Sequence, residues 1–588
     1  MFRSCKRYFI AAVLFSIAAA FLDMVTPKLV QYTVDHVLGS EIPDSPFVAD
    51  VISFFGGRDI LRSRLWIIAL LVAGVALVSA LFRYLYHVVN VRGTEKMVKS
   101  LRDRLFDHIL HLPFSWHDKN HTGDIIQRCT SDVETIRNFV AEQMAALFRI
   151  LILVVLSLFF MFRIHTGMAF ISAAFIPIVV LYSLFFHKKI GGAFQHADEE
   201  EGHLSAIAQE NLTGVRVVRA FGRERYERER FEVQNESYTK MWIRLMGWLS
   251  AFWSSNDFIT GMQIMLITVV GAVFCVQGSI SVGAYIAFTS YNSMLAWPIR
   301  ELGRVISDMS RVGISMGRIR YILDSPVEET KTTAEGSAPA ACDIVFDHVS
   351  FSYADGPKVL DDISFKLPAG KTLGILGGTG AGKSTLMYLL ERLYELPEDC
   401  GRITLGGTDI RKIPLDVLRS RIGLVLQEPF LFSRTLAENI AITQPGKPDM
   451  TAVEKAAATA DLKETIARFT EGYETFVGER GVTLSGGQKQ RCAIAQILVK
   501  DPPVMIFDDS LSAVDMETDA RIRQALKRQT KGSSLILISH RITTLKQADH
   551  IIVLDKGRIA EEGTHEELMQ KGGIYRQICD IQTEGAEL

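Results

Sequence analysis

Apolar residues gather in the first half of the chain, in long runs separated by charged stretches. A helix needs roughly 20 apolar residues to cross the hydrocarbon core of a bilayer, and several runs reach that length. Six spans fit the pattern best: Tyr8 to Leu29, Leu65 to Val89, Gln143 to Phe162, Thr166 to Phe186, Phe258 to Val276 and Val282 to Ile299. The pattern therefore predicts an all-α transmembrane domain with six helices.

The first run begins like a signal peptide, because Arg3, Lys6 and Arg7 precede its apolar core. The apolar stretch nevertheless continues beyond the small residues Ala18 to Ala20, and further spans follow. We therefore expect a membrane anchor that is retained in the mature protein.

Two long charged stretches, 92–137 and 188–244, keep a helical repeat of apolar residues, so we expect the membrane helices to continue through them beyond the lipid. Both stretches are rich in Lys and Arg, whereas acids outnumber bases between Asp35 and Ile60. Basic loops remain on the cytoplasmic side. This asymmetry predicts a multi-pass protein of the cell membrane, the inner or plasma membrane of a bacterium, with both termini cytoplasmic.

Composition agrees with a protein that lies partly in lipid. The chain has 588 residues, of which 48% are hydrophobic, and its mean hydropathy of +0.18 is high for a soluble enzyme. The 64 basic and 66 acidic residues give a net charge of −2, which implies no nucleic acid partner. The seven cysteines lack metal-ligand spacing, so they indicate no zinc site.

The stretch 324–341 is rich in Glu, Thr, Ala, Pro and Ser and has no apolar period, which is typical of a linker. It divides the chain into a membrane domain, 1–323, and a second domain, 342–588. In the second domain, Gly377 to Thr385 read GGTGAGKST and follow the strand-like run Thr372 to Leu376. This pattern predicts a phosphate-binding loop, in which backbone N–H groups surround the phosphates and Lys383 reaches their oxygens.

Further motifs follow this loop in order. Leu484 to Gln488 read LSGGQ, and they precede an apolar run, Val504 to Phe507, that ends in two acids. With these motifs the chain resembles the ATP-binding cassette (ABC) transporters, and the segment Thr475 to Gly481 is similar to a loop of the exporters among them. The resemblance implies that 342–588 form an α/β nucleotide-binding domain with a helical subdomain. Four further residues match the family pattern: Tyr353, Gln427, Asp508 and His540.

The resemblance implies a role for each residue of the site, with ATP and Mg²⁺ as cofactors. Tyr353 stacks on the adenine, and Ser384, Gln427 and Asp508 hold Mg²⁺, the last through water. His540 senses the γ-phosphate. Ser485 and Gly487 contact the ATP that a second subunit binds. The phosphates lie on Gly377, Gly378, Thr379, Gly380, Ala381, Gly382, Lys383, Ser384 and Thr385.

The sequence holds one phosphate loop, one signature and six spans, which is half of a transporter. The resemblance therefore implies a dimer that works by alternating access. It also implies that the segments around 112–133 and 210–214 form coupling helices, which press on the nucleotide-binding domains.

One departure from the family pattern concerns the catalytic base. The family usually has Asp-Glu where this chain has Asp508-Asp509. Asp is one methylene shorter than Glu, so Asp509 should draw back from the attacking water by about 1.5 Å and hydrolyse ATP slowly. Because the signature is intact, we predict a heterodimer, in which this chain completes an active site on a related subunit. A homodimer with Asp509 as a poorer base is the alternative.

The cargo is the least determined part of the function. Aromatic residues of the spans could line a cavity for amphipathic small molecules of the multidrug type, or could face lipid instead; they are Phe159, Phe160, Phe162, Phe252, Trp253, Phe258, Phe288, Tyr291 and Trp297. A lipid flippase or a peptide exporter would share this architecture. The absence of charge from Val282 to Ile299 favours export over an ATP-gated channel. We expect Asp23 and Lys28 to lie at the outer interface, and Arg83 and Arg163 to snorkel, with their charged ends directed towards the lipid headgroups.

Overall fold

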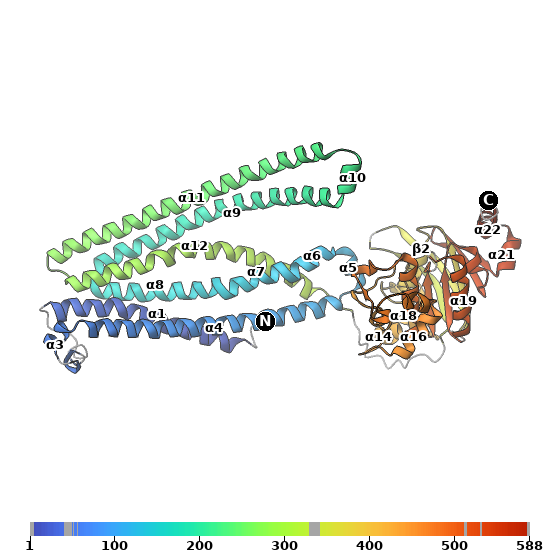
Figure 1. Ribbon diagram of the computed structural model, residues 1–588, viewed down its shortest axis with the longest axis horizontal. Helices are drawn as coiled ribbons and strands as arrows, with labels where there is room; N and C mark the ends of the chain where they lie inside the picture. Colours follow the sequence, from blue (N-terminus) through green and yellow to red (C-terminus); the bar gives the residue numbers. More distant parts are fainter. Residues whose placement is uncertain are drawn as a thin grey trace. The chain divides into compact units, whose positions relative to one another are not determined.

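The computed structural model describes residues 5–39, 50, 52–55, 57–328, 342–354, 356–510, 514–529 and 532–584. Most of the predicted linker, 329–341, lies outside them. The chain forms two compact units: Met1–His111 with Asn120–Ser325, and Leu112–Lys119 with Pro326–Leu588. The first unit is helical, and the second combines sheets with helices (Figure 1). Each unit is described by itself.

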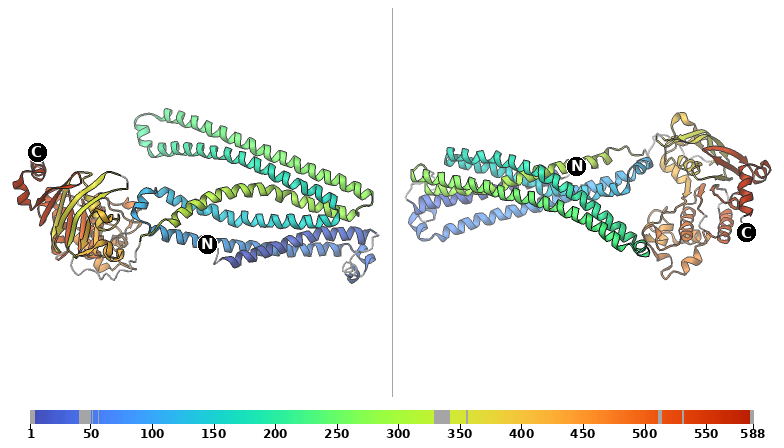
Figure 2. Two further views of the ribbon diagram at one scale, coloured as in Figure 1. Left: turned by 180° about the vertical axis from the view of Figure 1, so that it is seen from behind. Right: turned by 90° about the horizontal axis from the view of Figure 1, so that it is seen from above.

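Long helices build the first unit, and the two longest, α9 and α11, far exceed the thickness of the bilayer. The 48 residues of α9 and the 53 residues of α11 correspond to about 70 and 80 Å of helix, against roughly 30 Å of hydrocarbon. These two helices run side by side (Figure 2). The long helices are α1 (Lys6–Tyr32), α4 (Trp66–Leu110), α8 (Met144–Ile164), α9 (Thr166–Thr213), α11 (Glu224–Val276) and α12 (Val282–Asp324).

Shorter pieces join these helices. In the first charged stretch the helix is interrupted between α4 and α5, and in the second between α9 and α10. Both interruptions lie at turns expected from the sequence. The pieces are η1 (Thr33–Leu38), α3 (Arg58–Ser63), α5 (Phe114–Lys119), α6 (Thr122–Gln127), η2 (Arg128–Asp132), α7 (Val133–Asn138), η3 (Phe139–Gln143) and α10 (Val215–Ala220).

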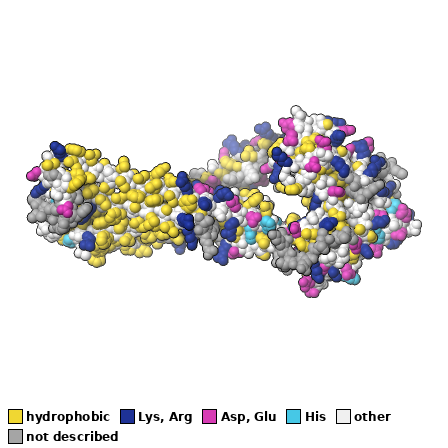
Figure 3. All heavy atoms as spheres, turned by 90° about the horizontal axis from the view of Figure 1, so that it is seen from below, with side chains coloured by type: hydrophobic (Ala, Val, Ile, Leu, Met, Phe, Trp, Pro, Cys, Tyr) yellow, Lys and Arg dark blue, Asp and Glu magenta, His cyan; other side chains and the backbone are white. Residues whose placement is uncertain are grey.

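Five segments of the described chain are long and apolar enough to cross a membrane: Lys6–Leu38, Trp66–Leu110, Thr122–Ile164, Thr166–Thr213 and Glu224–Val276. On the face drawn in Figure 3, apolar side chains cover one stretch of the helical unit, and Lys and Arg gather where that stretch ends. The sixth predicted span is the first part of α12, which is helical but less apolar.

Buried hydrogen bonds explain the polar residues of α12. Asn292 accepts through Oδ1 from Ser172 Oγ at 2.7 Å and from Gln263 Nε2 at 3.0 Å, and all three side chains are buried. These bonds join α12 to α9 and α11. A polar side chain in lipid needs such a partner, and Asn292 finds it on the neighbouring helices.

Three sheets form the second unit. The largest has the order β12-β11-β3-β10-β9-β6, in which every pair is parallel except β12 with β11. A four-stranded antiparallel sheet, β2-β1-β4-β5, and the pair β7-β8 complete the set. The strands are β1 (Ile344–Ser352), β2 (Lys358–Leu367), β3 (Thr372–Gly377), β4 (Arg402–Leu405), β5 (Thr408–Asp409), β6 (Ile422–Val425), β7 (Arg434–Thr435), β8 (Phe476–Val477), β9 (Val504–Asp508), β10 (Ser534–Ile538), β11 (His550–Asp555) and β12 (Arg558–Gly563).

Strands β3 and β9 are buried along their whole length except at Thr372, so they read as continuous apolar runs. The helices of this unit are α13 (Lys383–Leu390), α14 (Leu415–Arg421), α15 (Leu436–Ile440), α16 (Met450–Thr459), α17 (Lys463–Ala467), α18 (Gly486–Lys500), α19 (Met516–Gln529), α20 (Ile542–Leu545), α21 (His565–Lys571) and α22 (Ile574–Glu584), with short 3₁₀ turns at Glu398–Cys400, Ile410–Lys412, Gly472–Glu474 and Glu479–Gly481.

The segment Leu112–Lys119 comes between two parts of the first unit in sequence, yet it belongs to the second unit. The Phe114 ring of α5 lies 5.6 Å from the Tyr394 ring, edge to face, and 6.1 Å from the Tyr388 ring. The Tyr394 hydroxyl donates to Asp118 at 3.3 Å. Aromatic packing and one hydrogen bond therefore hold α5 on the second unit.

Glu391, directly after α13, lies mostly out of solvent near two cations. Burial raises the pKa of its carboxyl to about 7, although the charges of Lys500 and Arg419 favour the ionised form. Arg419 donates from Nε to the Glu391 carbonyl oxygen at 3.3 Å, and Lys500 donates to the Arg419 carbonyl oxygen at 2.6 Å.

This raised pKa makes the stability of the second unit depend on pH. The folded state binds the proton more tightly than the unfolded chain, so stability should fall as the pH rises from 4.5 to about 7. Glu391→Gln keeps the shape but stays neutral, and it should remove this decrease, on the order of 2 kcal/mol. Thermal unfolding of the full chain at about pH 5 and about pH 7.5 measures the effect. Equal decreases in Tm for variant and wild type would contradict it.

Candidate nucleotide-binding site

Parallel pairing brings the sequence-predicted residues to one edge of the large sheet. The phosphate loop follows β3, His540 follows β10, Asp508 ends β9, and Gln427 follows β6. These four strands are neighbours in the order β3-β10-β9-β6. Carboxyl ends of parallel strands meet at the same edge, which is where ligands bind in open α/β sheets.

The backbone of the phosphate loop requires glycine at two of its positions. Gly382 has a φ of +95°, and a Cβ there would lie 2.6 Å from Leu360 Cδ2. A Cβ on Gly377 would lie 2.7 Å from the Leu554 carbonyl oxygen. Any larger residue would push the loop away from β2 or β11. The loop thus brings its N–H groups to the start of α13, where the helix dipole favours an anion.

Lys383 lies inside this loop. Its Nζ donates to the carbonyl oxygens of Gly377 and Gly378, each at 2.8 Å. Burial lowers the pKa of the ammonium, and the nearby charges of Asp508 and Asp509 act in the opposite direction. The lysine is therefore held at the loop by two carbonyls, with its charge at the position where phosphate oxygens would bind.

Ser384 and Asp508 form the candidate magnesium site. Ser384 Oγ donates to Asp508 Oδ2 at 2.7 Å, which joins the phosphate loop to β9. Burial raises the pKa of Asp508, while the Ser384 hydrogen bond and the Lys383 charge favour its ionised form. A hydroxyl and a carboxylate are the hard oxygen ligands that Mg²⁺ prefers, so the residues fit that ion. Gln427 is exposed and, among the described residues, makes no hydrogen bond to either of them.

Tyr353 lies beside the phosphate loop, and its hydroxyl is 2.9 Å from Thr385 Oγ1. Its ring meets the rings of Tyr394 at 4.9 Å and Phe351 at 5.1 Å, both edge to face. Burial raises the pKa of its hydroxyl. The same Tyr394 packs against α5, so one aromatic cluster extends from the predicted adenine contact to α5.

Asp509 and His540 follow adjacent strands. The backbone N–H of Asp509 donates to the Ile538 carbonyl oxygen at 2.9 Å, and its φ is +44°, a left-handed conformation that is uncommon outside glycine. His540 is close enough to Asp508 for its charge to lower the pKa of that carboxyl. The structure therefore brings Asp508, Asp509 and His540 together.

The signature residues lie elsewhere in the unit. Ser485 caps α18: its Oγ accepts from the Gln488 N–H at 3.3 Å, and Gln488 Oε1 accepts from the Ser485 N–H at 2.8 Å. Helix α18 packs in a different hydrophobic cluster from α13. Within the described part of the chain, no hydrogen bond joins Ser485 or Gly487 to the phosphate loop. Ser485 and Gly486 are exposed, Gly487 is partly exposed, and the helix that follows packs apart from α13.

Comparisons with known proteins agree with this geometry. The ABC transporter transmembrane region matches residues 9–299, and the ABC transporter domain matches residues 360–512. The chain is 34% identical over 588 residues to the "Probable multidrug resistance ABC transporter ATP-binding/permease protein YheI" of Bacillus subtilis, covering 98% of this chain and 95% of that one. It is 32% identical over 561 residues to the "ATP-dependent lipid A-core flippase" of Aromatoleum aromaticum, covering 94% and 90%.

A solved bacterial Atm1-family ABC exporter with ATP bound superposes with a TM-score of 0.83 and 26% identity, covering 98% of each chain. The chain therefore belongs to the ABC transporter family, as its motifs predicted. It is a multi-pass membrane protein of the exporter type, in which an ATPase domain drives transport by alternating access.

Lys383→Ala should abolish or severely weaken ATP binding, because no other cation takes the place of its ammonium among the described residues of the loop. Binding of a fluorescent ATP analogue to the purified protein measures the loss. Lys371→Ala is the matched control, since Lys371 pairs with Asp549 at the opposite end of β3. Tight binding by the Lys383 variant would contradict the assignment.

Proposed function

We propose that the chain is one subunit of a heterodimeric exporter of amphipathic small molecules in a bacterial inner or plasma membrane. The observation that carries the heterodimer is Asp509, which stands where the family has glutamate. On this proposal all six spans cross the membrane, α12 included, and both termini are cytoplasmic. A lipid flippase or a peptide exporter remains the alternative on the same architecture.

Backbone geometry adds to the argument from Asp509. Its N–H is held by Ile538, so the main chain has little freedom to move the shorter side chain towards the water. General-base catalysis typically contributes about 10² to 10⁴-fold, and a carboxylate withdrawn by about 1.5 Å forfeits much of that. This site then binds ATP and hydrolyses it slowly.

The separate signature supports a dimer. Ser485 and Gly487 form no hydrogen bond to the phosphate loop among the described residues, and α18 packs in a different hydrophobic cluster from α13, so we infer that they serve ATP held by a second subunit. The second coupling segment points the same way, because Leu212, Val217 and Phe221 are large apolar residues that stand exposed around α10. A nucleotide-binding domain of the partner would cover them.

The ATP site combines charge and metal chemistry. Lys383 and the loop N–H groups bind phosphate, and Ser384 with Asp508 would hold Mg²⁺, which neutralises the phosphate oxygens. Gln427, in the adjacent loop, is proposed as a further magnesium ligand, and Tyr353 as the adenine contact. His540 is proposed to sense the γ-phosphate from the end of β10.

Three of the aromatic residues expected at a cargo site do come together. Phe252, Trp253 and Trp297 line a mostly apolar cavity of about 150 Å³, which His187 and Glu301 also line, and the two tryptophan rings are stacked at 6.3 Å. In contrast, Phe288 and Tyr291 are fully buried in the helical core. An apolar, aromatic cavity supports an amphipathic cargo.

Asp509 gives the first test of this proposal. Asp509→Glu should raise ATP turnover at this chain's own site by about 10² or more, because it restores the reach of the base. Asp509→Asn should leave turnover of the heterodimer almost unchanged. Turnover is measured on the chain purified alone and with partners encoded beside it. A dimer of this chain alone that shows full drug-stimulated turnover, and loses it with Asp509→Asn, would refute the heterodimer.

Phe114 gives the second test. Phe114→Ala removes two aromatic contacts, worth about 0.5–1.5 kcal/mol each beyond burial, so transport should fall about tenfold while ATP affinity stays unchanged. Transport into inverted vesicles and ATP binding are measured on the same preparation. Phe106→Ala, at an exposed position of α4, is the control. Equal losses of ATP binding and transport would show general damage and not uncoupling.

A further inference from the structure

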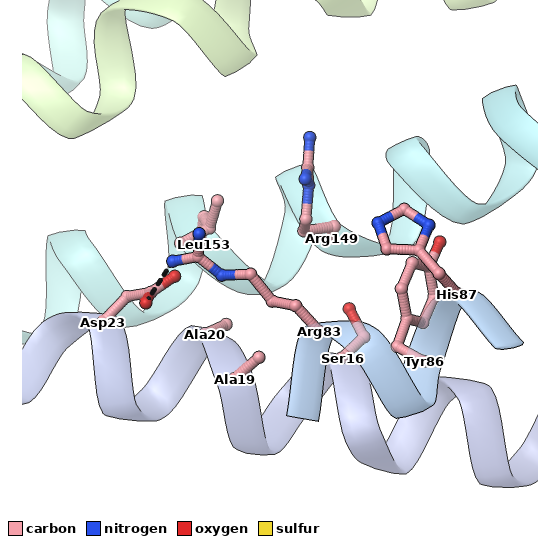
Figure 4. A pocket seen from close by; sticks show the side chains of 9 residues that line it. All are labelled: Ser16, Ala19, Ala20, Asp23, Arg83, Tyr86, His87, Arg149 and Leu153. Atoms are coloured by element: carbon pink, nitrogen blue, oxygen red, sulfur yellow. Dashed lines mark hydrogen bonds and ion pairs between the residues drawn. The ribbon is translucent and has the colours of Figure 1, made fainter. Parts of the chain in front are cut away.

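Charged residues of three helices meet in a cavity of the helical unit. The cavity has a volume of about 170 Å³, more than ten times what one water requires, and α1, α4 and α8 line it. Figure 4 shows the Arg83 side chain extended along α1 towards Asp23, whereas Arg149 of α8 points away from this pair; His87 also lines the cavity. A carboxylate from the neighbouring helix α1 therefore pairs with Arg83.

These charges lie within the membrane segments. About 25 Å of helix separate Arg83 from the start of α4, and about 22 Å separate Arg149 from the end of α8. Against a hydrocarbon core of roughly 30 Å, both residues lie nearer its cytoplasmic side on the proposed orientation. Asp23 pairs with Arg83 and so lies at the same depth, not at the outer interface where it was expected. Ionisable groups within the membrane are costly and are found where they have a partner or a function.

The cavity has more cationic donors than acceptors. Asp23 Oδ1 accepts from Arg83 Nη2 at 2.5 Å and from Ser79 Oγ at 2.7 Å, which neutralises Arg83. Arg149 and His87 form no ion pair with any carboxylate in the described residues. The Ser16 hydroxyl, only 5% exposed, also lines the cavity and has no hydrogen-bond partner there.

We propose that this cavity binds the anionic headgroup of an amphiphile, with Arg149 and Arg83 as its counter-charges and Asp23 as an internal anion that holds Arg83 until the headgroup arrives. The proposal deepens the function above, because it names the charge of the cargo that the exporter accepts.

The donor set decides between an anion and a cation. A guanidinium offers only donors, in a planar fork that matches the oxygens of a phosphate or carboxylate. Asp23 is the one carboxylate among the described lining residues, and it already pairs with Arg83. A cationic ligand would therefore find no unpaired carboxylate among them. The volume suits a headgroup, and an acyl tail would lie outside on exposed apolar side chains such as Leu14, Leu81 and Leu151.

Asp23 competes with the headgroup for Arg83. A headgroup that reaches Arg83 must displace a carboxylate that already occupies it, while Arg149 is open to it directly. Weakening the internal anion should therefore strengthen binding of the external one. An Asp23–Arg83 pair that only holds α1 and α4 together predicts no such gain, since the loss of a purely structural pair has no reason to tighten a ligand.

Binding of dodecyl phosphate and of dodecyltrimethylammonium, which share one tail, tests the charge preference on the full chain purified in a neutral detergent without nucleotide. We expect wild type to bind the phosphate more tightly. Asp23→Asn should bind it several-fold more tightly than wild type, and Arg149→Gln about tenfold more weakly, as expected for one lost charge-assisted hydrogen bond. Arg163→Gln, on the same helix but outside the cavity, should match wild type.

The proposal would be overturned if Asp23→Asn and Arg149→Gln both bound the phosphate with wild-type affinity. Elution of each variant like wild type on size exclusion shows that it is folded. Tighter binding of the ammonium, weakened by Asp23→Asn, would overturn it in favour of a cation site.

A bilayer lipid and an exported amphiphile offer the same anionic chemistry, so transport is measured separately in inverted vesicles. ATP-driven movement of a fluorescent single-chain phosphate, lost in Arg149→Gln, identifies cargo. Arg149-dependent binding of phosphatidylglycerol without movement identifies a lipid that occupies the same anion site. Failure of export with Arg149-dependent binding intact refutes the proposed function and leaves the site standing.

Discussion

The parallel pairing of β3, β10, β9 and β6 is the constraint on which the ATPase chemistry depends. The phosphate loop follows β3, and each of the other three strands contributes one or two residues at its carboxyl end. These four groups are distant from one another in sequence. The pairing alone makes them neighbours. The hydrogen bond from Ser384 to Asp508 then joins the phosphate loop to β9, so these two candidate magnesium ligands are held at the edge of the sheet.

Aromatic packing connects the phosphate loop to α5 within the second unit. Tyr353 touches the phosphate loop through Thr385, and Tyr394 touches both Tyr353 and Phe114. A change in the position of the nucleotide contact can therefore reach α5 through three rings that pack edge to face. Packed rings transmit displacement well, because close-packed groups have little room to absorb it.

Sequence predicted the parts of the site that are contiguous. The phosphate loop and the signature each need their residues in one short run, so their spacing is visible in the chain. Tyr394 escaped notice because its role depends on Phe114, which is distant in sequence and reaches it only in the fold. The pair of Arg83 with Asp23 could not be predicted for a similar reason, because the two residues lie on different helices. The two helix breaks, before α5 and before α10, were visible because each interrupts a helical period. The first part of α12, predicted as a sixth span, is not among the five segments that are long and apolar enough to cross a membrane, and its buried Asn292 bonds to α9 and α11.

The two hydrogen bonds of Lys383 have a consequence for the stiffness of the loop. The ammonium bonds to the Gly377 and Gly378 carbonyl oxygens, so the side chain ties the end of the loop back to its beginning. Backbone dipoles thereby offset a buried charge, and the loop keeps its curvature through bonds within its own sequence. The lysine that marks the motif in the sequence is thus also a structural brace of the loop.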